Sequence, residues 1–358
     1  MFGEILAMNK IDYKKYQNFL FNFSSSYSGG GLKRLLAFVK WFNERGGANF
    51  IVHENLNGKL DDFPLNTYHY INVSNIKKIF NYQKYIDVAS EKMEMCEFYY
   101  SYNIPNMNKY AKKSWFHLSN VLPFTNMSRF NIPFRRKVEL WWLGILTKNC
   151  LKTFDYVSAE SEFSIDSLNL DSKKKFQISP NGSDVEIKII TSLVKQKVKK
   201  NFAVIIGTYH HKNLIDSYKI FKHLRNHNKG LKLIIFGDKE TVPNHIKQDK
   251  NVESYGVIEH KKVLEFLANC KFYINTSMVE NSWNAASEGI FLAKESYIST
   301  IPPHYELLKD SKLELVNKLD TCDPIIHIFR DDLKIKKLLT WDEIISNMIR
   351  YTKRNHER

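Results

Sequence analysis

The sequence contains no apolar run long enough to cross a bilayer. Its most apolar stretch is WWLGIL at 141–146, whereas a membrane-spanning helix needs about 20 such residues. Charged residues also interrupt the opening stretch, MFGEILAMNKIDYKKYQNFLF, where a secretory signal would have an apolar centre. We therefore expect a soluble, cytoplasmic protein.

Closely spaced cysteines are also missing. The cysteines are Cys96, Cys150, Cys270 and Cys322, and their separation fits neither a zinc ribbon nor a disulfide framework. We expect them to be reduced thiols, as in a cytosolic protein.

Acidic residues are too few to balance the basic ones. The chain has 53 Lys and Arg residues but 38 Asp and Glu residues, which gives a formal net charge of +15. Such an excess indicates an anionic partner, which could be nucleic acid, lipid headgroups or a phosphorylated substrate. Because no helix-turn-helix, zinc-finger or RRM signature occurs, we expect no nucleic acid as a partner. A nucleic-acid-binding protein stays the alternative from another class.

The composition, 43% hydrophobic and 14% aromatic over 358 residues, is that of a globular protein large enough for two domains. Short apolar runs alternate with helical patterns along the first half of the chain. Strands are expected at 18–23, 48–53, 68–73, 113–120, 155–161 and 176–182. Helices are expected at 32–45, 76–95 and 134–152.

The same alternation is clearer in the second half. Strands are expected at 201–207, 231–237, 252–256, 270–277 and 296–300, and helices at 212–226, 260–269 and 282–293. Strict alternation predicts an α/β protein whose parallel sheets carry helices on both faces. We expect two doubly wound domains, residues 1–183 and 184–340, and a C-terminal helix within 341–358 that packs back on the first domain.

Two glutamates follow a predicted buried strand of the second half. Glu280 comes after the strand CKFYINTS, and Glu288 lies about two turns into the next helix. Asn281 or Ser282 is expected to cap that helix, whose N-terminus would favour a diphosphate. Carboxylates accept hydrogen bonds from vicinal diols, so one glutamate can hold a ribose and the other a sugar. Glutamates eight apart also arise by chance, so the position after a buried strand carries this prediction.

A glycine-rich loop follows the first predicted strand. The segment SYSGGGLKRLL at 26–36 places Gly30 and Gly31 just before a helix. Glycine lets a backbone approach a phosphate or a sugar closely, and a helix N-terminus favours anions. The segment has neither the Walker pattern nor GxGxxG. A flexible turn is the alternative interpretation.

Several segments resemble the retaining GT-B glycosyltransferases of family 4. They are YGVIEHKKVLEFLANCKFYINTSMVENSWNAASEG with its E-x7-E pattern, IIGTYHHKNLIDSYKIFKHL, LKLIIFGD and the interdomain turn SPNGSDVE. The resemblance covers the region from about 180 to 300 well and the N-terminal half only loosely. It implies two Rossmann-like domains facing each other across a cleft. It also implies transfer from a nucleotide-diphosphate sugar with retention, without a cofactor or a metal.

The resemblance assigns roles to single residues. Glu288 would bind the ribose, Glu280 the transferred sugar and Lys212 the departing diphosphate. His117, at the end of a predicted strand, would contact the donor sugar, with a structural histidine as the alternative. The other residues expected at the donor are Gly207, His211, Val257 beside the base, Asn281, Ser282, Trp283 and Asn284 at the phosphate and sugar, and Gly30 and Gly31.

Two departures from the family pattern indicate a divergent member. The family has an arginine shortly after the glycine that matches Gly207, where this chain has Thr208 and Tyr209. Diphosphate binding would then rest on Lys212, or on Lys212 helped by His211. The Gly-x-Pro segment after the second glutamate appears here as FLAKESYI. A catalytically inactive sugar-binding relative therefore stays open.

Two remaining features of the sequence concern metal binding and membrane binding. His223 and His227 lie four apart on a predicted helix but have no third ligand nearby in the sequence, so an exposed helix face is expected. The segment 129–152 combines basic residues with Trp141 and Trp142. Such a helix either lies on an anionic membrane surface or packs as a core helix with a solvated basic edge.

These features predict a hexosyltransferase that uses a nucleotide-diphosphate sugar. The acceptor would be a saccharide or a polyprenyl-linked glycan, and the setting would be bacterial surface polysaccharide synthesis, such as O-antigen, capsule or lipopolysaccharide. The enzyme would work in the cytoplasm, with a peripheral contact to the inner face of the plasma membrane if the first reading of 129–152 holds. A GT-B nucleotide-sugar epimerase and a non-catalytic sugar-nucleotide-binding protein are the alternatives.

Overall fold

A computed structural model describes residues 16–72, 96–105, 111–129, 132–169, 175–182, 199–316, 319, 321–333 and 339–354. The helix predicted at 76–95 and the predicted domain boundary between 183 and 184 lie outside these residues. All four cysteines are free thiols, as their spacing predicted.

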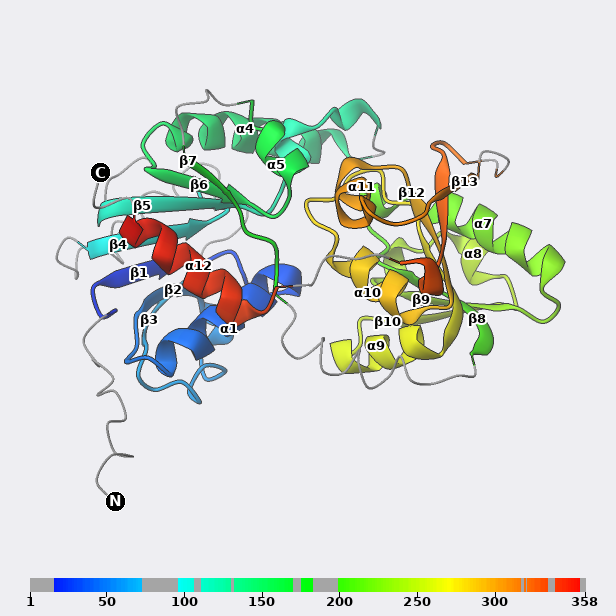
Figure 1. Ribbon diagram of the computed structural model, residues 1–358, viewed down its shortest axis with the longest axis horizontal. Coiled ribbons are helices and arrows are strands. Elements are labelled where there is room, and N and C mark those ends of the chain that lie inside the picture. The colour runs from blue at the N-terminus through cyan, green and yellow to red at the C-terminus, as the bar shows by residue number, and fades with distance from the viewer. Residues whose placement is uncertain are drawn as a thin grey trace, which may run out of the picture.

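The first sheet consists of parallel strands in the order β3-β2-β1-β4-β5-β6-β7 (Figure 1). Its strands are β1 (Phe19–Asn22), β2 (Asn49–His53), β3 (Thr67–Ile71), β4 (Cys96–Tyr102), β5 (Ala111–Leu118), β6 (Tyr156–Ala159) and β7 (Lys175–Ile178). The helices of this half are α1 (Gly29–Asn43), α4 (Phe134–Leu151) and α5 (Glu162–Asp166), with short 3-10 turns η1 (Glu54–Leu56), η2 (Leu122–Phe124) and η3 (Met127–Arg129).

The second sheet has the order β10-β9-β8-β11-β12-β14-β13. Its strands are β8 (Lys200–Ile206), β9 (Lys232–Phe236), β10 (Val252–Gly256), β11 (Cys270–Asn275), β12 (Glu295–Ser299), β13 (Glu314–Val316) and β14 (Ile325–Phe329). The strand β14 runs antiparallel to β12 and to β13. The helices and turns are η4 (His210–Lys212), α7 (Leu214–His227), η5 (Lys239–Thr241), α8 (Asn244–Lys247), α9 (His260–Asn269), α10 (Asn284–Leu292), α11 (Pro302–Leu308) and η6 (Arg330–Asp332).

Among its parallel strands, each sheet reverses its strand order at one point, between β1 and β4 and between β8 and β11. In open parallel sheets, ligands bind beyond the carboxyl ends of the strands at such a switch point. The two domains lie side by side (Figure 1), and a cavity of about 360 Å³ lies between them. Its lining includes Phe163 and Ser167 from the first domain and Met278, Val279 and Ile301 from the second.

Aromatic side chains dominate the core of the first domain. Phe21, Phe38, Phe42, Phe50 and Tyr100 are fully buried, and the Phe21 and Phe50 rings stack with centroids 5.2 Å apart. Large rings bury much apolar surface and add favourable edge and stacking contacts. The first domain therefore holds its sheet against α1 mainly through aromatic packing.

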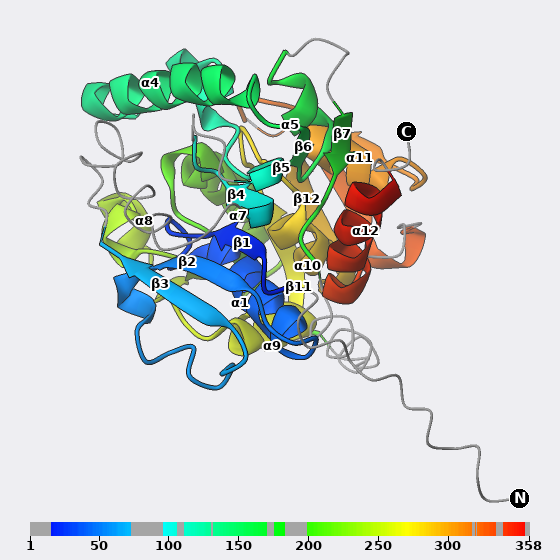
Figure 2. The same cartoon turned by 90° about the vertical axis from the view of Figure 1, so that its left-hand side faces the viewer.

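The last helix, α12 (Trp341–Arg354), lies against the first domain beside α1 (Figure 2). Its residues Ile345, Met348 and Ile349 belong to the same buried cluster as the α1 residues Phe38 and Phe42. The Trp41 indole also donates a hydrogen bond to Asp342 over 2.7 Å. The chain thus passes through the second domain and returns to the first.

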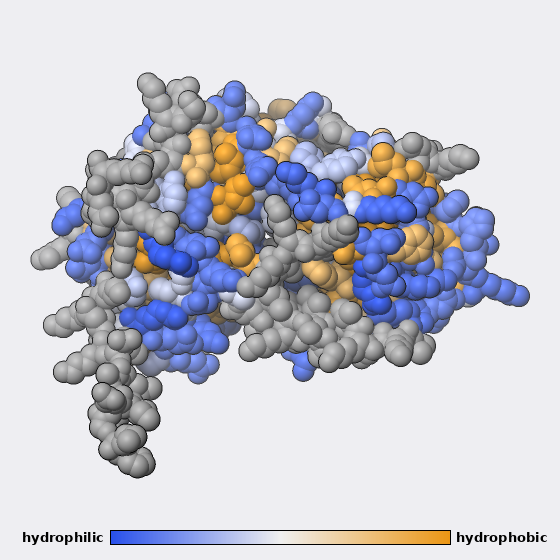
Figure 3. All heavy atoms as spheres, in the orientation of Figure 1, coloured by the Kyte–Doolittle hydropathy of each residue, from blue (hydrophilic) through white to orange (hydrophobic). Residues whose placement is uncertain are grey.

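The structure confirms most of the elements that the sequence predicted, within about two residues at each end. It adds β4, a strand next to β1, which the sequence did not reveal. It also adds the antiparallel pair β13 and β14 and the short helices α8 and α11. Among the coloured residues in Figure 3, hydrophilic side chains predominate and apolar ones form separate patches.

Gly289 of α10 provides a test of how tightly α10 packs on β11. A Cβ atom at Gly289 would lie 2.3 Å from ring atoms of Tyr273, and Tyr273 is fully buried. Gly289→Ala should therefore lower the free energy of unfolding by about 1–3 kcal/mol through overpacking, measured by urea denaturation. Gly30→Ala is the control, because the nearest atom to its Cβ is 4.0 Å away. A Gly289→Ala protein as stable as the control would contradict this packing.

Candidate functional site

The centre of the candidate site is an ion pair between two loops of the second domain. The Lys212 ammonium, in the turn η4 after β8, lies 2.5 Å from Glu280 Oε1, in the loop after β11. The Ser277 hydroxyl donates to the same carboxylate oxygen over 2.6 Å. A backbone bond from Met278 N to His211 O, 2.8 Å long, joins the two loops a second time. The topology therefore brings together Lys212 and Glu280, which lie 68 positions apart.

Gly207 makes room for the lysine. Its backbone has a φ of +90°, a conformation that glycine adopts without steric cost. A Cβ atom there would lie 3.2 Å from both Cγ and Cε of Lys212. The aliphatic part of Lys212 therefore lies over Gly207, and its charge reaches Glu280.

Glu280 is ionised although its side chain is only 14% exposed. Burial alone would raise the pKa of its carboxyl group, but the charge of Lys212 and hydrogen bonds from Lys212 and Ser277 outweigh burial and bring that pKa below its ordinary value. An anionic Glu280 can only accept hydrogen bonds. It is therefore suited to accept hydrogen bonds from the hydroxyl groups of a ligand.

The helix α10 begins two residues later than predicted, and the predicted cap is wrong. Trp283 is the N-cap residue, and no side chain caps this helix. The Asn281 side chain accepts a hydrogen bond from Ser164 Oγ of the first domain, over 2.9 Å, and is therefore turned away from the role of a cap. Asn284 is the first helical residue, and Ser282 lies in the loop before it.

Glu288, inside α10, contacts groups from two other helices. Its Oε1 lies 2.9 Å from His260 Nε2 of α9 and 3.5 Å from the Lys33 ammonium of α1. Burial would raise the pKa of Glu288, but the His260 hydrogen bond and the Lys33 charge lower it overall. Because Lys33 belongs to the first domain, Glu288 lies where the two domains meet.

The glycine-rich loop opens α1 on the opposite side of this junction. Gly30 and Gly31 lie within the first turn of α1, and its N-cap Ser28 makes no side-chain cap. A Cβ atom at Gly31 would lie 3.2 Å from both Ser26 Oγ and Tyr102 Cε1, so this position requires glycine or a local shift. Both α1 and α10 thus start without a side-chain cap, and uncapped N–H groups favour anions.

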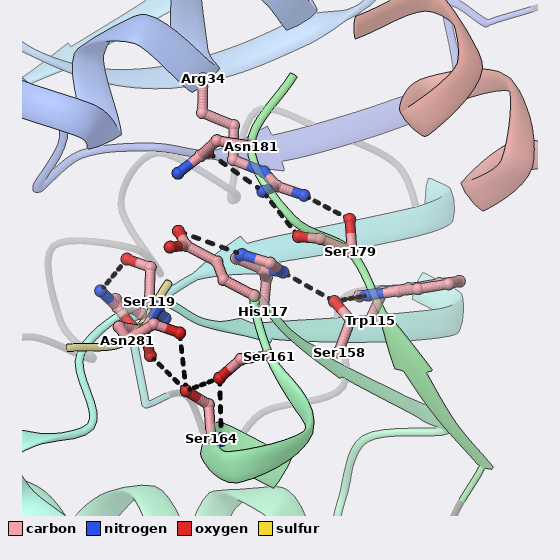
Figure 4. A network of polar contacts seen from close by, with 12 residues as sticks. Arg34, Trp115, His117, Ser119, Ser158, Ser161, Ser164, Ser179, Asn181 and Asn281 are labelled. Atoms are coloured by element: carbon pink, nitrogen blue, oxygen red, sulfur yellow. Dashed lines mark hydrogen bonds and ion pairs between the residues drawn. The ribbon is translucent and has the colours of Figure 1, made fainter. Parts of the chain in front are cut away.

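His117 is fully buried at the carboxyl end of β5. Its Nδ1 lies 2.7 Å from Ser158 Oγ (Figure 4), and its ring stacks on Tyr102 with centroids 5.4 Å apart. Burial and the charge of Arg34 lower the pKa of His117 to about 3, so the ring is neutral at physiological pH. Its Nε2 lies 3.9 Å from Glu160 Oε1.

The remaining predicted residues surround the Lys212–Glu280 pair more loosely. The His211 ring is stacked on Tyr209, and burial and the Lys212 charge lower the pKa of His211 to about 4. Val257, after β10, is 86% exposed, and Trp283 packs partly against the core of the second domain.

His223 and His227 are the pair that the sequence offered as metal ligands. The rings of His223 and His227 lie 5.2 Å apart on the exposed side of α7. Among the described residues, no group of three or more metal-ligating side chains comes together.

Sequence reasoning missed four residues of this region: Lys33, Arg34, Glu160 and His260. Lys33 and Arg34 follow the glycine-rich loop, and Glu160 follows β6 directly. Their positions after strands and at a helix start were a usable signal, because that is where ligands bind in parallel sheets. His260 opens α9, and no local pattern marks it.

His117 predicts an acid-sensitive step in folding stability. The unfolded chain binds the His117 proton near pH 6.5, whereas the folded protein binds it near pH 3, so stability falls as the pH drops below 6.5. The loss reaches about 2 kcal/mol near pH 5. His117→Gln should lose about 2 kcal/mol less than the unmodified protein between about pH 7 and pH 5, measured by urea unfolding. His223→Gln, on the exposed side of α7, should behave like the unmodified protein, and equal losses in all three would contradict the prediction.

Comparisons with known proteins identify the fold that carries this site. No family model matches the chain, and no curated protein sequence matches it. The Anabaena protein HepE in complex with UDP-glucose matches with a TM-score of 0.56 at 16% identity, over 81% of this chain and 82% of its own. The alpha,alpha-trehalose 6-phosphate synthase of Burkholderia multivorans matches with a TM-score of 0.55 at 8% identity, over 82% and 86%.

An E. coli trehalose-6-phosphate structure bound with UDP-2-fluoro glucose also matches, with a TM-score of 0.53 at 10% identity, over 81% of this chain and 86% of its own. At identities this low, the likeness establishes the fold alone. The chain has the GT-B fold, with two Rossmann-like domains. Among the described residues, no helix has the length and apolar character to cross a membrane.

Proposed function

We propose that this protein is a glycosyltransferase that takes a hexose from a nucleotide-diphosphate sugar. The observation that carries the proposal is the arrangement of Lys212, Glu280 and Glu288 around the uncapped start of α10, at the carboxyl edge of the second sheet. The matching structures of HepE and of the E. coli protein hold UDP-glucose and UDP-2-fluoro glucose. A nucleotide sugar therefore fits both the chemistry of the site and the fold.

The donor would lie with its diphosphate at the N-terminus of α10, where free N–H groups and the helix dipole favour negative charge. Lys212 adds a fixed positive charge beside it. Glu288 would accept hydrogen bonds from the ribose. Its carboxylate would then leave Lys33 and His260, or the three side chains would move together. Glu280 would accept hydrogen bonds from the hexose, and the backbone near Val257 would meet the base.

The reaction would depend on electrostatic stabilisation of the leaving group. The bond between the anomeric carbon and the phosphate oxygen breaks, and its electron pair stays on the diphosphate. Lys212 and the N–H groups of α10 would stabilise that charge as it develops. The acceptor hydroxyl oxygen, held in position, would bond to the anomeric carbon and give its proton to the departing diphosphate. We propose retention of configuration and no metal requirement, on the strength of the family resemblance in 255–289.

We further propose a saccharide or polyprenyl-linked acceptor, in the synthesis of a bacterial surface polysaccharide such as lipopolysaccharide. The helix α4 supports a contact with an anionic membrane. Phe134, Val138 and Trp141 are 82%, 45% and 56% exposed and lie on one stripe of the helix. Arg135 and Lys148 flank the stripe, as in helices that lie on anionic lipid surfaces.

Glu288→Ala tests the donor site. Removing this carboxylate removes charged hydrogen bonds to the ribose, so we expect transfer activity to fall about 100-fold or more, with a melting temperature close to that of the unmodified protein. Transfer is measured with the nucleotide sugar that raises the melting temperature most in a panel, since a ligand at 100 times its Kd adds about 2.7 kcal/mol.

The matched control is Glu240→Ala, an exposed glutamate in η5, which should leave activity unchanged. Unchanged turnover in Glu288→Ala would refute the site assignment. Incubation with the donor alone separates an epimerase, because only an epimerase converts the nucleotide sugar without an acceptor.

The α4 stripe gives a second test. Replacing Phe134 and Trp141 by serine should weaken binding to phosphatidylglycerol vesicles about tenfold or more, because two large apolar side chains no longer enter the lipid. Co-sedimentation with vesicles measures the change. Ile215→Ser with Leu315→Ser is the control, since these side chains are 51% and 54% exposed in the other domain. Equal binding by both double variants would contradict the membrane contact.

A further inference from the structure

A cavity of the first domain, here called the α4 cavity, lies between α4 and the carboxyl edge of the first sheet. It is lined by the loops after β1, β4 and β5, by η2 and by one side of α4. Its volume is about 300 Å³, at the lower end of the range of about 300–1,000 Å³ for ligand pockets. None of its lining residues belongs to the donor site or to the exposed stripe of α4 described above.

The surroundings of the α4 cavity are held in place by the protein itself. Asn103, whose backbone has a φ of +59°, accepts a hydrogen bond from Ser119 N over 2.7 Å and donates one to Ser119 Oγ over 2.6 Å. These bonds join the loops after β4 and β5. Gly144 lets α4 approach η2 closely, because a Cβ atom there would lie 2.9 Å from Pro123 O. The cavity is therefore largely preformed, as ligand pockets usually are.

Charged side chains of α4 line one side of the α4 cavity. Two arginines orient Glu139: Arg136 Nη1 lies 2.9 Å from its Oε2, and Arg135 Nε lies 3.4 Å from its Oε1. A carboxylate can only accept hydrogen bonds and a guanidinium can only donate them, so Glu139 and Arg136 offer both kinds of group to one ligand. Hydroxyl groups, which donate and accept, match this pair. The Glu139 charge disfavours an anionic ligand.

Trp142 adds a flat apolar surface to the same cavity. It lies three positions after Glu139 on α4, a spacing that makes the two side chains neighbours. The face of an aromatic ring is negatively polarised, so it complements the C–H groups on one side of a pyranose ring. An aromatic plane beside paired donor and acceptor groups therefore suits a neutral sugar, whereas a lipid tail would gain nothing from Glu139 and Arg136.

Phe124 connects the α4 cavity with the cavity between the domains. It lines both of them, and the interdomain cavity is also lined by Met278 and Val279, the two residues before Glu280. The proposed hexose position lies at Glu280. A glycan whose reacting end lies there would have its next units beside Phe124 and the α4 cavity.

We propose that the α4 cavity binds a neutral sugar unit of the acceptor, further along the glycan than the unit that receives the hexose. Trp142 stacks on this unit, and Glu139 and Arg136 bond to its hydroxyl groups. The acceptor is then an oligosaccharide, free or lipid-linked, and an earlier glycosyl transfer must supply it. This inference rests on the proposed function in so far as it names an acceptor glycan.

Nitrogen-15 NMR of the Trp142 indole tests the site without a nucleotide sugar. The probes are four neutral trisaccharides: maltotriose, cellotriose, mannotriose and chitotriose. The Trp142 resonance is identified as the one that is missing in Trp142→Ala. At least one trisaccharide should move this resonance in a saturable way. Glu139→Gln, which keeps the size of the side chain and removes its charge, should bind that trisaccharide about tenfold or more weaker.

The matched control is Glu44→Gln. Glu44 is also paired with an arginine, Arg45, over 3.4 Å, but it lines neither cavity, so the affinity should stay unchanged. A Trp142 resonance that all four trisaccharides leave in place overturns the proposal, as does equal affinity in Glu139→Gln and the control. A resonance that farnesyl phosphate moves and the trisaccharides do not assigns the cavity to a lipid tail and also overturns it.

Failure of this inference and failure of the proposed function give different results. A protein that binds a trisaccharide at Trp142 but binds no nucleotide sugar refutes the proposed function and supports the sugar site. A protein that binds a nucleotide sugar but whose Trp142 resonance responds to none of the four trisaccharides keeps the proposed function and overturns this inference.

Discussion

The ion pair between Lys212 and Glu280 is the interaction on which the geometry of the candidate site depends. Both side chains are about 15% exposed, and removing one partner of such a largely buried pair leaves an uncompensated charge at a cost of up to about 3–5 kcal/mol. The pair connects the loops after β8 and β11, the two strands at the switch point of the second sheet. Gly207 permits the approach, since any larger residue there would meet the lysine stem. The start of α10 is positioned by the same loop.

The residues that form the site also join the domains. Asn281 accepts from Ser164 of α5 over 2.9 Å, and Glu288 meets Lys33 of α1. Glu306 of α11 accepts the N–H groups of Glu162 and Phe163 over 3.0 and 2.8 Å, and so caps α5 from the other domain. A ligand that competes for the Glu288 carboxylate therefore acts on the same contacts that hold the domains together. In the proposed function, donor binding and domain orientation would be coupled through shared atoms rather than through a distant path.

Burial on both faces explains which parts of the fold were predictable from sequence. Parallel strands such as β8, β9 and β11 appear as continuous apolar runs, and they were predicted within about two residues. The strand β4 was missed because Glu97 and Ser101 interrupt its apolar pattern next to a segment with helical spacing. In the site, the rule that ligands follow parallel strands led to Glu280, and the family resemblance led to Lys212. The meeting of Lys33 with Glu288 depends on how two domains face each other, which no local pattern encodes.

The family that this chain resembles has an arginine shortly after the glycine that matches Gly207, and this chain lacks it. The positions of the cationic groups show which charges are present instead. His211 occupies the same turn as Lys212, but with its pKa lowered to about 4 the ring is neutral and cannot replace that charge. A second positive charge reaches the junction from the opposite domain, through Lys33 of α1, 3.5 Å from Glu288. The negative charge of a diphosphate at the start of α10 would then be balanced by Lys212 from one domain and Lys33 from the other. Because that balance requires both domains together, the positive charge around the proposed diphosphate would depend on domain closure, whereas an arginine on the second domain alone would supply it in any orientation.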